Sequence, residues 1–352
     1  MSQALRNQQT AQGAQLGTVA EQAVPLSFSN DAIALQATQT GVALYDRTHW
    51  GRIRVGDRDY LRFLHNQTTN AFEGRKPGEG CDTVFVTSTA RTIDLATAYI
   101  LEDGVLLLVS PGRSTSLIAW MDRYIFFADK VSLQDVTTET AAFSVIGPES
   151  ETLLRTLEVE SLSNQPYGTH QEVSLKGIPV RVAVGSGVAI AGYTLITPID
   201  HAADLWGILV DTGAVPMGEN AWEQLRIQQG RPVPDHELTD DFNPLEAGLW
   251  STISLSKGCY IGQETIARLY TYRGVKQQLW GIQLEGAVTP GSTITAGAEK
   301  VGVLTSSIAT DAGYWGLAYI RTKALEGNLQ QVQVEGVSGY LVSLPFVDHT
   351  YL

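Results

Sequence analysis

The chain has 352 residues, more than one hydrophobic core usually supports, so we expect two or three domains. Hydrophobic residues make up 43% of it, as in globular proteins, and the net charge of −13 argues against strong nucleic-acid binding. Two cysteines, Cys81 and Cys259, are too few for a disulfide framework or a four-thiolate metal site. The histidines are scattered singly, so we expect no intrinsic metal.

The N-terminal residues 1–35 predict a flexible arm. Met1 to about Val24 is rich in Gln, Ala and Thr and lacks the charged-then-apolar pattern of a secretory signal. No apolar run approaches the ~20 residues that cross a bilayer. We therefore expect a cytoplasmic protein that does not contact a membrane.

Residues 36–140 predict the first part of a mixed α and β domain. Gly51–Val55 alternates like a strand, and Asp57 and Asp59 are suitable caps for a following helix. Val105–Val109 is predicted as a buried strand, and Ser114 opens an amphipathic helix.

Residues 141–215 predict a second domain. A strand over Ala142–Ile146 precedes a helix over Glu149–Leu157, and two strands follow at Val180–Val184 and Val188–Thr194. Asp200 caps a further helix. This order of elements resembles the split β-α-β unit of ferredoxin-like domains.

Residues 216–276 and residues 277–352 predict different kinds of secondary structure. The first segment contains a helix over Asn220–Gln229, ended by Gly230, and then a polar loop. The second contains short apolar stretches separated by turn residues, which predict a small β-barrel or sandwich.

Lys257–Glu264, with the sequence KGCYIGQE, is the most unusual segment of the chain. A cation near a thiol enriches the reactive thiolate, and Lys257 and Arg268 flank Cys259 in sequence. A lone cysteine is, however, most often a small buried hydrophobe. Asp94 also has two interpretations, because it is either a strand-end residue in water or a buried acid with a shifted pKa.

This segment, followed by Ala267-Arg268 and Arg273-Gly274, resembles the signature of YgfZ-type proteins. These are folate-binding proteins implicated in iron–sulfur cluster assembly or repair and linked to tRNA modification, and they are relatives of the glycine cleavage T-protein. Shorter matching segments run from about Gly41 to Leu344, among them Phe63–Asn70, Leu225-Arg226-Ile227 and Val303–Ser306.

The resemblance implies an α+β, three-domain aminomethyltransferase-like ring with a ferredoxin-like middle domain and a C-terminal β-barrel. Residues 216–276 would return to complete the first domain and carry the signature. The protein would be a monomer that binds tetrahydrofolate or a derivative in a central channel.

The resemblance also implies site residues. Cys259, Lys257 and Asp94 would be the catalytic candidates. Gly258, Tyr260, Gly262, Gln263 and Glu264 would form the signature loop. The expected folate contacts are Asn66, Tyr193, Arg226, Gln228 and Arg268.

The chain departs from the T-protein pattern at three positions. No carboxylate follows Gly192-Tyr193-Thr194, Gln228 stands where relatives often carry Glu, and Leu95 replaces a second aspartate after Asp94. Carboxylates pair well with the amino-pyrimidine edge of a pterin, so their loss bears on folate affinity.

These features lead to three functional hypotheses. The first is a folate-binding accessory protein that serves iron–sulfur client or assembly proteins through Cys259. The second is a tetrahydrofolate-dependent aminomethyltransferase in which Asp94 positions the amine. The third is a scaffold that binds proteins without catalysis.

Overall fold

The structure is a computed structural model, and it describes residues 2–159 and 162–351. Packing divides the chain into two compact units. Unit 1 comprises Met1–Leu64, Phe72–Asp82 and Ala96–Glu223. Unit 2 comprises His65–Ala71, Thr83–Leu95 and Gln224–Leu352. Within the described ranges, every helix is too short or too polar to cross a membrane.

Unit 1 contains a six-stranded sheet. Its strand order is β10 (His170–Leu175), β11 (Ile178–Val184), β12 (Gly192–Pro198), β9 (Thr140–Ile146), β3 (Ala43–Asp46) and β13 (Val215–Met217). All neighbours are antiparallel except β3 and β13. Helices α5 (Ser150–Thr156) and α6 (Ala202–Asp211) contribute Leu154 and Trp206 to its core, and η1 (Ile199–His201) precedes α6.

This sheet differs in detail from the predicted second domain. The strand predicted at Val188–Thr194 starts later, at Gly192, and β10 was not predicted. β10 is an edge strand in which polar residues such as Gln171 and Glu172 are partly or fully exposed, so it lacks an apolar run. β3 and β13 come from outside residues 141–215, because strand pairing joins segments that are distant in sequence.

A second sheet has five strands. Their order is β5 (Gly80–Val86), β6 (Thr92–Leu101), β7 (Gly104–Pro111), β4 (Trp50–Gly56) and β8 (Ser132–Asp135). Both β5 and β6 contribute residues to the two units. The predicted helices after Asp59 and from Ser114 are present as α3 (Tyr60–Gln67) and α4 (Ser114–Asp122).

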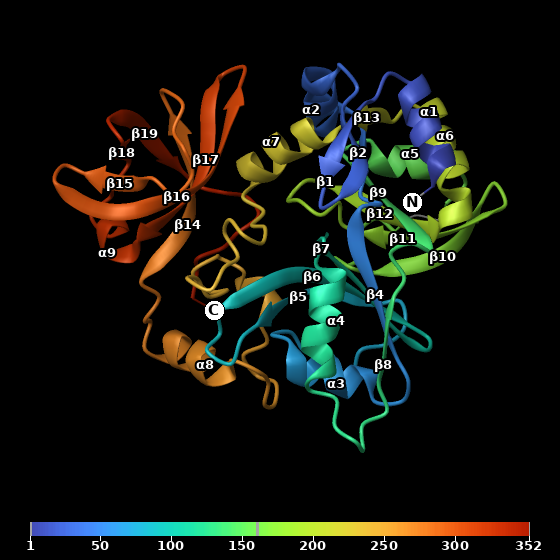
Figure 1. Ribbon diagram of the computed structural model, residues 1–352, viewed down its shortest axis with the longest axis horizontal. Coiled ribbons are helices and arrows are strands. Elements are labelled where there is room, and N and C mark those ends of the chain that lie inside the picture. The colour runs from blue at the N-terminus through green and yellow to red at the C-terminus, as the bar shows by residue number, and fades with distance from the viewer. Residues whose placement is uncertain (1, 160–161, 352) are drawn as a thin grey trace. The chain divides into compact units, whose positions relative to one another are not determined.

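The N-terminal region differs from the flexible arm predicted for residues 1–35. It forms α1 (Gln3–Ala11), a hairpin of β1 (Gln15–Val19) and β2 (Gln22–Ser27), and α2 (Asp31–Thr40). Figure 1 shows α1 beside α6, where the Trp206 indole donates to the Gln12 side chain at 2.7 Å. Arg6 and Gln9 also bond Asp46, so polar side chains dock a segment whose composition suggested disorder.

Unit 2 contains the closed six-stranded barrel predicted at the C-terminus (Figure 1). Its strands in order are β14 (Gln277–Leu284), β17 (Gly313–Arg321), β16 (Glu299–Thr310), β15 (Thr293–Ala296), β18 (Gln331–Val334) and β19 (Val337–Val342). Ile282, Leu304 and Ile320 fill its interior. Before the barrel come α7 (Glu219–Gln229), η2 (Trp250–Thr252) and α8 (Gln263–Thr271), and α9 (Thr322–Leu325) follows β17.

Candidate functional site

The signature loop, Lys257–Glu264, lies in unit 2 and leads into α8. A small hydrophobic cluster supports it: Tyr260 and Ile266 pack with Trp250, Ile253 and Val275. The loop is therefore built on a core of its own, although its sequence is mostly polar or small.

Lys257 attaches the loop to the end of α3 and the segment that follows it. Its ammonium donates to the carbonyl oxygens of His65, Thr68 and Asn70, the last at 2.7 Å. An ammonium has three donors, so these carbonyls use all of them. The sequence suggested that Lys257 stabilises a thiolate, whereas here its hydrogen bonds go to backbone oxygens.

Tyr260 and Ile261 fix the loop on the other side of the cysteine. The Lys257 ammonium lies 4.3 Å from the centroid of the Tyr260 ring, a favourable cation–π distance. Burial raises the pKa of the Tyr260 phenol to about 12, so the ring stays neutral near pH 7. The Ile261 amide donates to the Asn66 carbonyl oxygen at 3.0 Å.

Gly262 permits the tight turn into α8. Its φ is +82°, and a Cβ there would lie 2.9 Å from the Thr87 carbonyl oxygen. Only glycine fits this conformation and approach without strain. Gln263 and Glu264 then form the first turn of α8, where the carboxylate of Glu264 complements the helix dipole.

Cys259 is exposed between these fixed points. A Cβ built on the neighbouring Gly258 meets nothing within 4 Å, so the backbone there faces open space. Cys81, in contrast, is a buried free thiol in β5. The sequence left open whether Cys259 is a buried hydrophobe, and its exposure removes that interpretation.

Arg226, an expected folate contact, lies in a buried cluster on α7. Its guanidinium is 1% exposed and donates to Glu237 at 3.0 Å and to the Ser306 hydroxyl at 3.0 Å. Glu237 is fully buried and also accepts from Thr305 at 2.7 Å. The charge of Arg226 is thus balanced inside the protein.

Glu237 was missed by the sequence analysis, which placed it in a polar loop. Nothing local distinguishes it from a solvated acid, because its partners Arg226 and Ser306 are distant in sequence. Glu246 was missed too, although its position between Leu245 and Ala247 was a usable signal. Burial raises the pKa of Glu246.

The remaining expected folate contacts of unit 2 are more accessible. Asn66, in α3, and Arg268, in α8, are exposed, and Gln228, in α7, is half-buried. The structure therefore offers one cation and two amides from this group of residues at the surface of unit 2.

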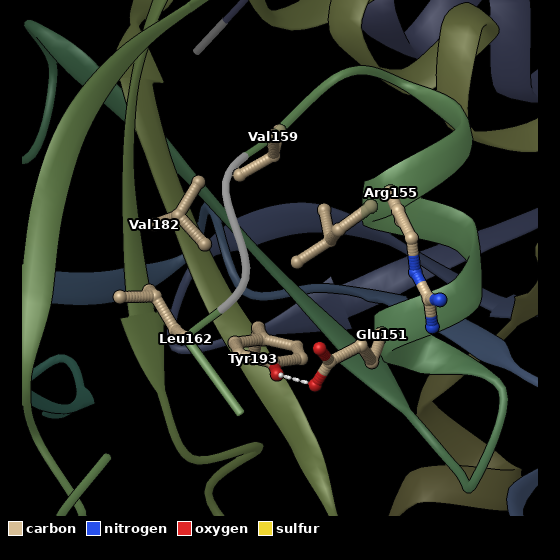
Figure 2. A pocket seen from close by; sticks show the side chains of 7 residues that line it. Glu151, Arg155, Val159, Leu162, Val182 and Tyr193 are labelled. Carbon is tan, nitrogen blue, oxygen red and sulfur yellow. Dashed lines mark hydrogen bonds between the residues drawn. The ribbon is translucent and has the colours of Figure 1, made fainter. Parts of the chain in front are cut away.

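Tyr193 lies in unit 1, in β12, and faces α5 (Figure 2). Its hydroxyl donates to Glu151 at 2.9 Å, and burial together with Glu151 raises its pKa to about 12. The two residues line a cavity of about 10 Å³ with Leu154, Leu162 and Val182. That volume suits about one water molecule, but Tyr193 and Glu151 also line an open pocket of about 440 Å³ with Asn164 and Gly185.

Asp94 is fully buried in β6, and its carboxylate accepts from the Leu95 amide at 2.9 Å. Of the two interpretations from the sequence, the structure supports the buried acid. Apolar side chains of Val84, Val86 and Leu95 belong to the core of the same unit. Across the described ranges, no three His, Cys, Asp or Glu side chains are grouped to hold a metal.

Comparison with known proteins identifies the family. The sequence matches the GCVT N-terminal domain over residues 5–257, well over half of the chain. The chain belongs to the GCVT family. A chloroplastic protein of Arabidopsis thaliana, whose name proposes a transferase without a substrate, is 49% identical over 94% of this chain and 77% of its own length.

Other GCVT-family relatives are named aminomethyltransferases. The protein of Geobacillus kaustophilus is 28% identical over 92% of both chains, and that of Rubrobacter xylanophilus is 28% identical over 97% of this chain and 93% of its own. The crystal structure of aminomethyltransferase T of the glycine cleavage system from Bartonella henselae superposes with a TM-score of 0.83 at 18% identity, covering 99% of this chain and 98% of that one. The predicted aminomethyltransferase-like α+β fold is thereby confirmed.

Proposed function

We propose that this GCVT-family protein is a folate-binding accessory protein that supports assembly or repair of iron–sulfur proteins through the thiol of Cys259. The observation that carries the proposal is the signature loop. Lys257, Tyr260 and Ile261 each make a specific contact, and Gly262 takes a backbone conformation that favours glycine, while Cys259 is exposed.

A thiol held in this way suits reaction with a second protein. Exposure lets a partner's sulfur reach it, and a fixed backbone keeps the direction of approach constant. A cysteine kept only for packing would need neither an open neighbour at Gly258 nor a lysine that bonds three carbonyls.

The folate part of the proposal rests on three residues. Arg226 and Tyr193 already bond Glu237 and Glu151, so we assign recognition of the folate to Asn66, Gln228 and Arg268. Their two amides and one cation fit the polar groups of a pterin and the carboxylates of a glutamate tail. When bound, tetrahydrofolate supplies a carrier for one-carbon units.

The thiol role is tested by complementation. Cells whose only copy is Cys259→Ala should lose activity of cluster-dependent enzymes, whereas the matched variant Cys81→Ala should retain it because Cys81 is buried in β5. Normal cluster-enzyme activity with Cys259→Ala, at normal protein levels, would refute the thiol role.

The cofactor is tested separately by calorimetry with reduced folates. We expect binding by the wild-type protein and at least tenfold weaker binding by Gln228→Ala and Arg268→Ala, since each removes a charged or polar partner worth about 1.4 kcal/mol or more. An absence of heat with every reduced folate at high concentration would refute folate binding.

A second candidate function is tetrahydrofolate-dependent aminomethyl transfer. The names of the bacterial relatives and the burial of Asp94 favour it. Turnover of an aminomethylated carrier protein that disappears in Asp94→Asn but persists in Cys259→Ala would select this function over the first.

The cytoplasm stays our proposed compartment, while the name of the Arabidopsis protein places that relative in the chloroplast.

A further inference from the structure

The segment that carries the thiol has a charge opposite to that of the chain. Residues 247–284 contain the cations Lys257, Arg268, Arg273 and Lys276 and a single acid, Glu264. The local net charge is therefore 4 − 1 = +3, whereas the whole chain carries −13. An acidic protein with one basic segment attracts anionic partners to that segment and repels them elsewhere.

The basic residues are exposed on and just after α8. Arg268, Tyr272, Arg273 and Lys276 are all exposed, and Tyr272 shows 78% of its surface. α8 has 9 residues. A helix of that length extends about 13 Å, and the four residues from Cys259 to Gln263 add at most about 14 Å, so the thiol and these side chains fit within one side of an ordinary interface of ~800 Å².

Contacts within unit 2 hold this surface in place. The guanidinium of Arg273 lies 5.4 Å from the centroid of the Tyr351 ring, and the Tyr351 hydroxyl accepts from the Val275 amide at 3.3 Å. Lys257 contributes less to the surface charge than Arg273 and Lys276 do, because its ammonium donates to backbone carbonyl oxygens. Two acids bear on this surface: Glu246 is buried and interacts with Lys276, and Asp348 is exposed and stays charged at pH 7 because its bond from the Thr350 amide lowers its pKa.

We infer that the protein that exchanges sulfur chemistry with Cys259 docks through an acidic segment onto a face made of Tyr272, Arg273 and Lys276, hereafter the α8 docking face. This inference rests on the proposed function. Exposed aromatic and arginine side chains are the residue types that contribute most to binding at interfaces. An acidic protein segment is favoured over RNA because a nucleic acid needs a longer series of phosphate contacts, which a chain of charge −13 opposes.

The test measures how fast Cys259 reacts with two synthetic peptides in a Cys81→Ala background. One peptide carries four Glu and a Leu, the other four Lys and a Leu, and each has one cysteine joined by a disulfide to thionitrobenzoate. The Cys259 thiolate attacks the peptide sulfur, a new disulfide forms, and thionitrobenzoate leaves as a coloured thiolate while the thiol proton goes to solvent.

We expect the acidic peptide to react about tenfold faster than the basic one at low salt and less than about twofold faster in 1 M salt, because salt screens steering. Arg273→Gln/Lys276→Gln should lose this preference. The matched control Lys176→Gln/Lys300→Gln, which removes the same charge from two exposed residues outside this face, should retain it. Arg268 is left unchanged because it is assigned to folate.

Equal rates for the two peptides with the wild-type protein would overturn the inference, and so would an equal loss of preference in the Lys176→Gln/Lys300→Gln control. A ten-nucleotide single-stranded RNA that blocks the acidic peptide more strongly than polyglutamate of equal charge would replace the acidic protein with a nucleic acid. The complementation result for Cys259→Ala is independent of these rates, so failure of the proposed function and failure of the docking face are distinguishable.

Discussion

Two regions of unit 2, the signature loop and the Arg226–Glu237 cluster, each hold a cation, but in different ways. Arg226 is neutralised by the carboxylate of Glu237 and ties α7 to β16 through Ser306. Lys257 is held by three backbone carbonyl oxygens and the Tyr260 ring. The first arrangement joins α7 to β16 through a buried ion pair. The second fixes a loop without bringing a carboxylate beside the exposed thiol.

The difference explains why one cation belongs to the framework and the other to a site. A buried guanidinium needs a full counter-charge, and meeting that need leaves Arg226 almost no exposed surface. An ammonium bonded to carbonyl dipoles keeps its charge while it orders the backbone around it. Cys259 gains a fixed position from this arrangement and stays open to solvent.

The largest expected effect comes from breaking the buried pair. Glu237→Ala leaves the Arg226 charge uncompensated and should lower the free energy of unfolding by about 3–5 kcal/mol. Urea denaturation measures this, with Glu264→Ala in the exposed first turn of α8 as a control that should cost less than about 0.5 kcal/mol. Equal stabilities of the two variants would contradict the assignment of Arg226 to the framework.

His49 in unit 1 is a third case, a buried base with no hydrogen-bond partner for either ring nitrogen among the described residues. Burial, helped by Arg6, Arg47 and Arg52, lowers its pKa to about 3 from 6.5, even though the nearby Asp46 carboxylate acts to raise it.

The unfolded state therefore binds a proton below pH 6.5 that the folded state binds only near pH 3. The contribution of neutral His49 to the free energy of unfolding is fully present above pH 6.5. It should fall by up to about 1.4 kcal/mol per pH unit as the pH drops toward 3. Denaturation of His49→Leu at a series of pH values should show a shallower fall. The slope should not vanish, because His170, whose pKa is lowered to about 4 by burial and Arg181, contributes in the same direction. Identical slopes would show that His49 is not the group responsible.

Removing the lysine from the signature loop should have a local effect. Lys257→Met loses three charge-assisted hydrogen bonds and should cost about 2 kcal/mol. Hydrogen exchange at the Ile261 amide should accelerate. Alkylation of Cys259, which should follow a single exponential in the wild-type protein, should show more than one rate in the variant. Lys276→Met, at an exposed position, serves as the control and should leave Ile261 protection unchanged.

The last comparison concerns the two glycines of the signature loop, and it includes the substitution with the smallest expected effect, Gly258→Ala. Gly262→Ala forces a Cβ to 2.9 Å from the Thr87 carbonyl oxygen at φ +82°. It should cost about 1–3 kcal/mol through strain. A Cβ at Gly258 meets no atom within 4 Å. Gly258→Ala should therefore lower the free energy of unfolding by about 1 kcal/mol less than Gly262→Ala does, or leave it unchanged. Thermal denaturation of the pair decides whether the loop is held at Gly262, and a larger loss at Gly258 would contradict that.

Much of the architecture follows from local patterns. Val105–Val109 and the helix from Ser114 are where periodicity predicted them, because burial of one continuous apolar face is a local property. The N-terminal helix was not predicted, since its contacts with Asp46 and Trp206 use Arg6, Gln9 and Gln12, which resemble solvated residues in sequence. The edge strand β10 was missed for the same reason.

The sequence by itself determined the family resemblance, the C-terminal barrel and the identity of the segment, Lys257–Glu264, that carries the signature. Only the tertiary structure decided what each residue of that segment does. Exposure of Cys259, capture of the Lys257 ammonium by carbonyls, and burial of Arg226 against Glu237 all depend on atoms that lie far apart in the chain. Hydrogen bonds and burial act through space, so residue type and spacing alone do not specify them.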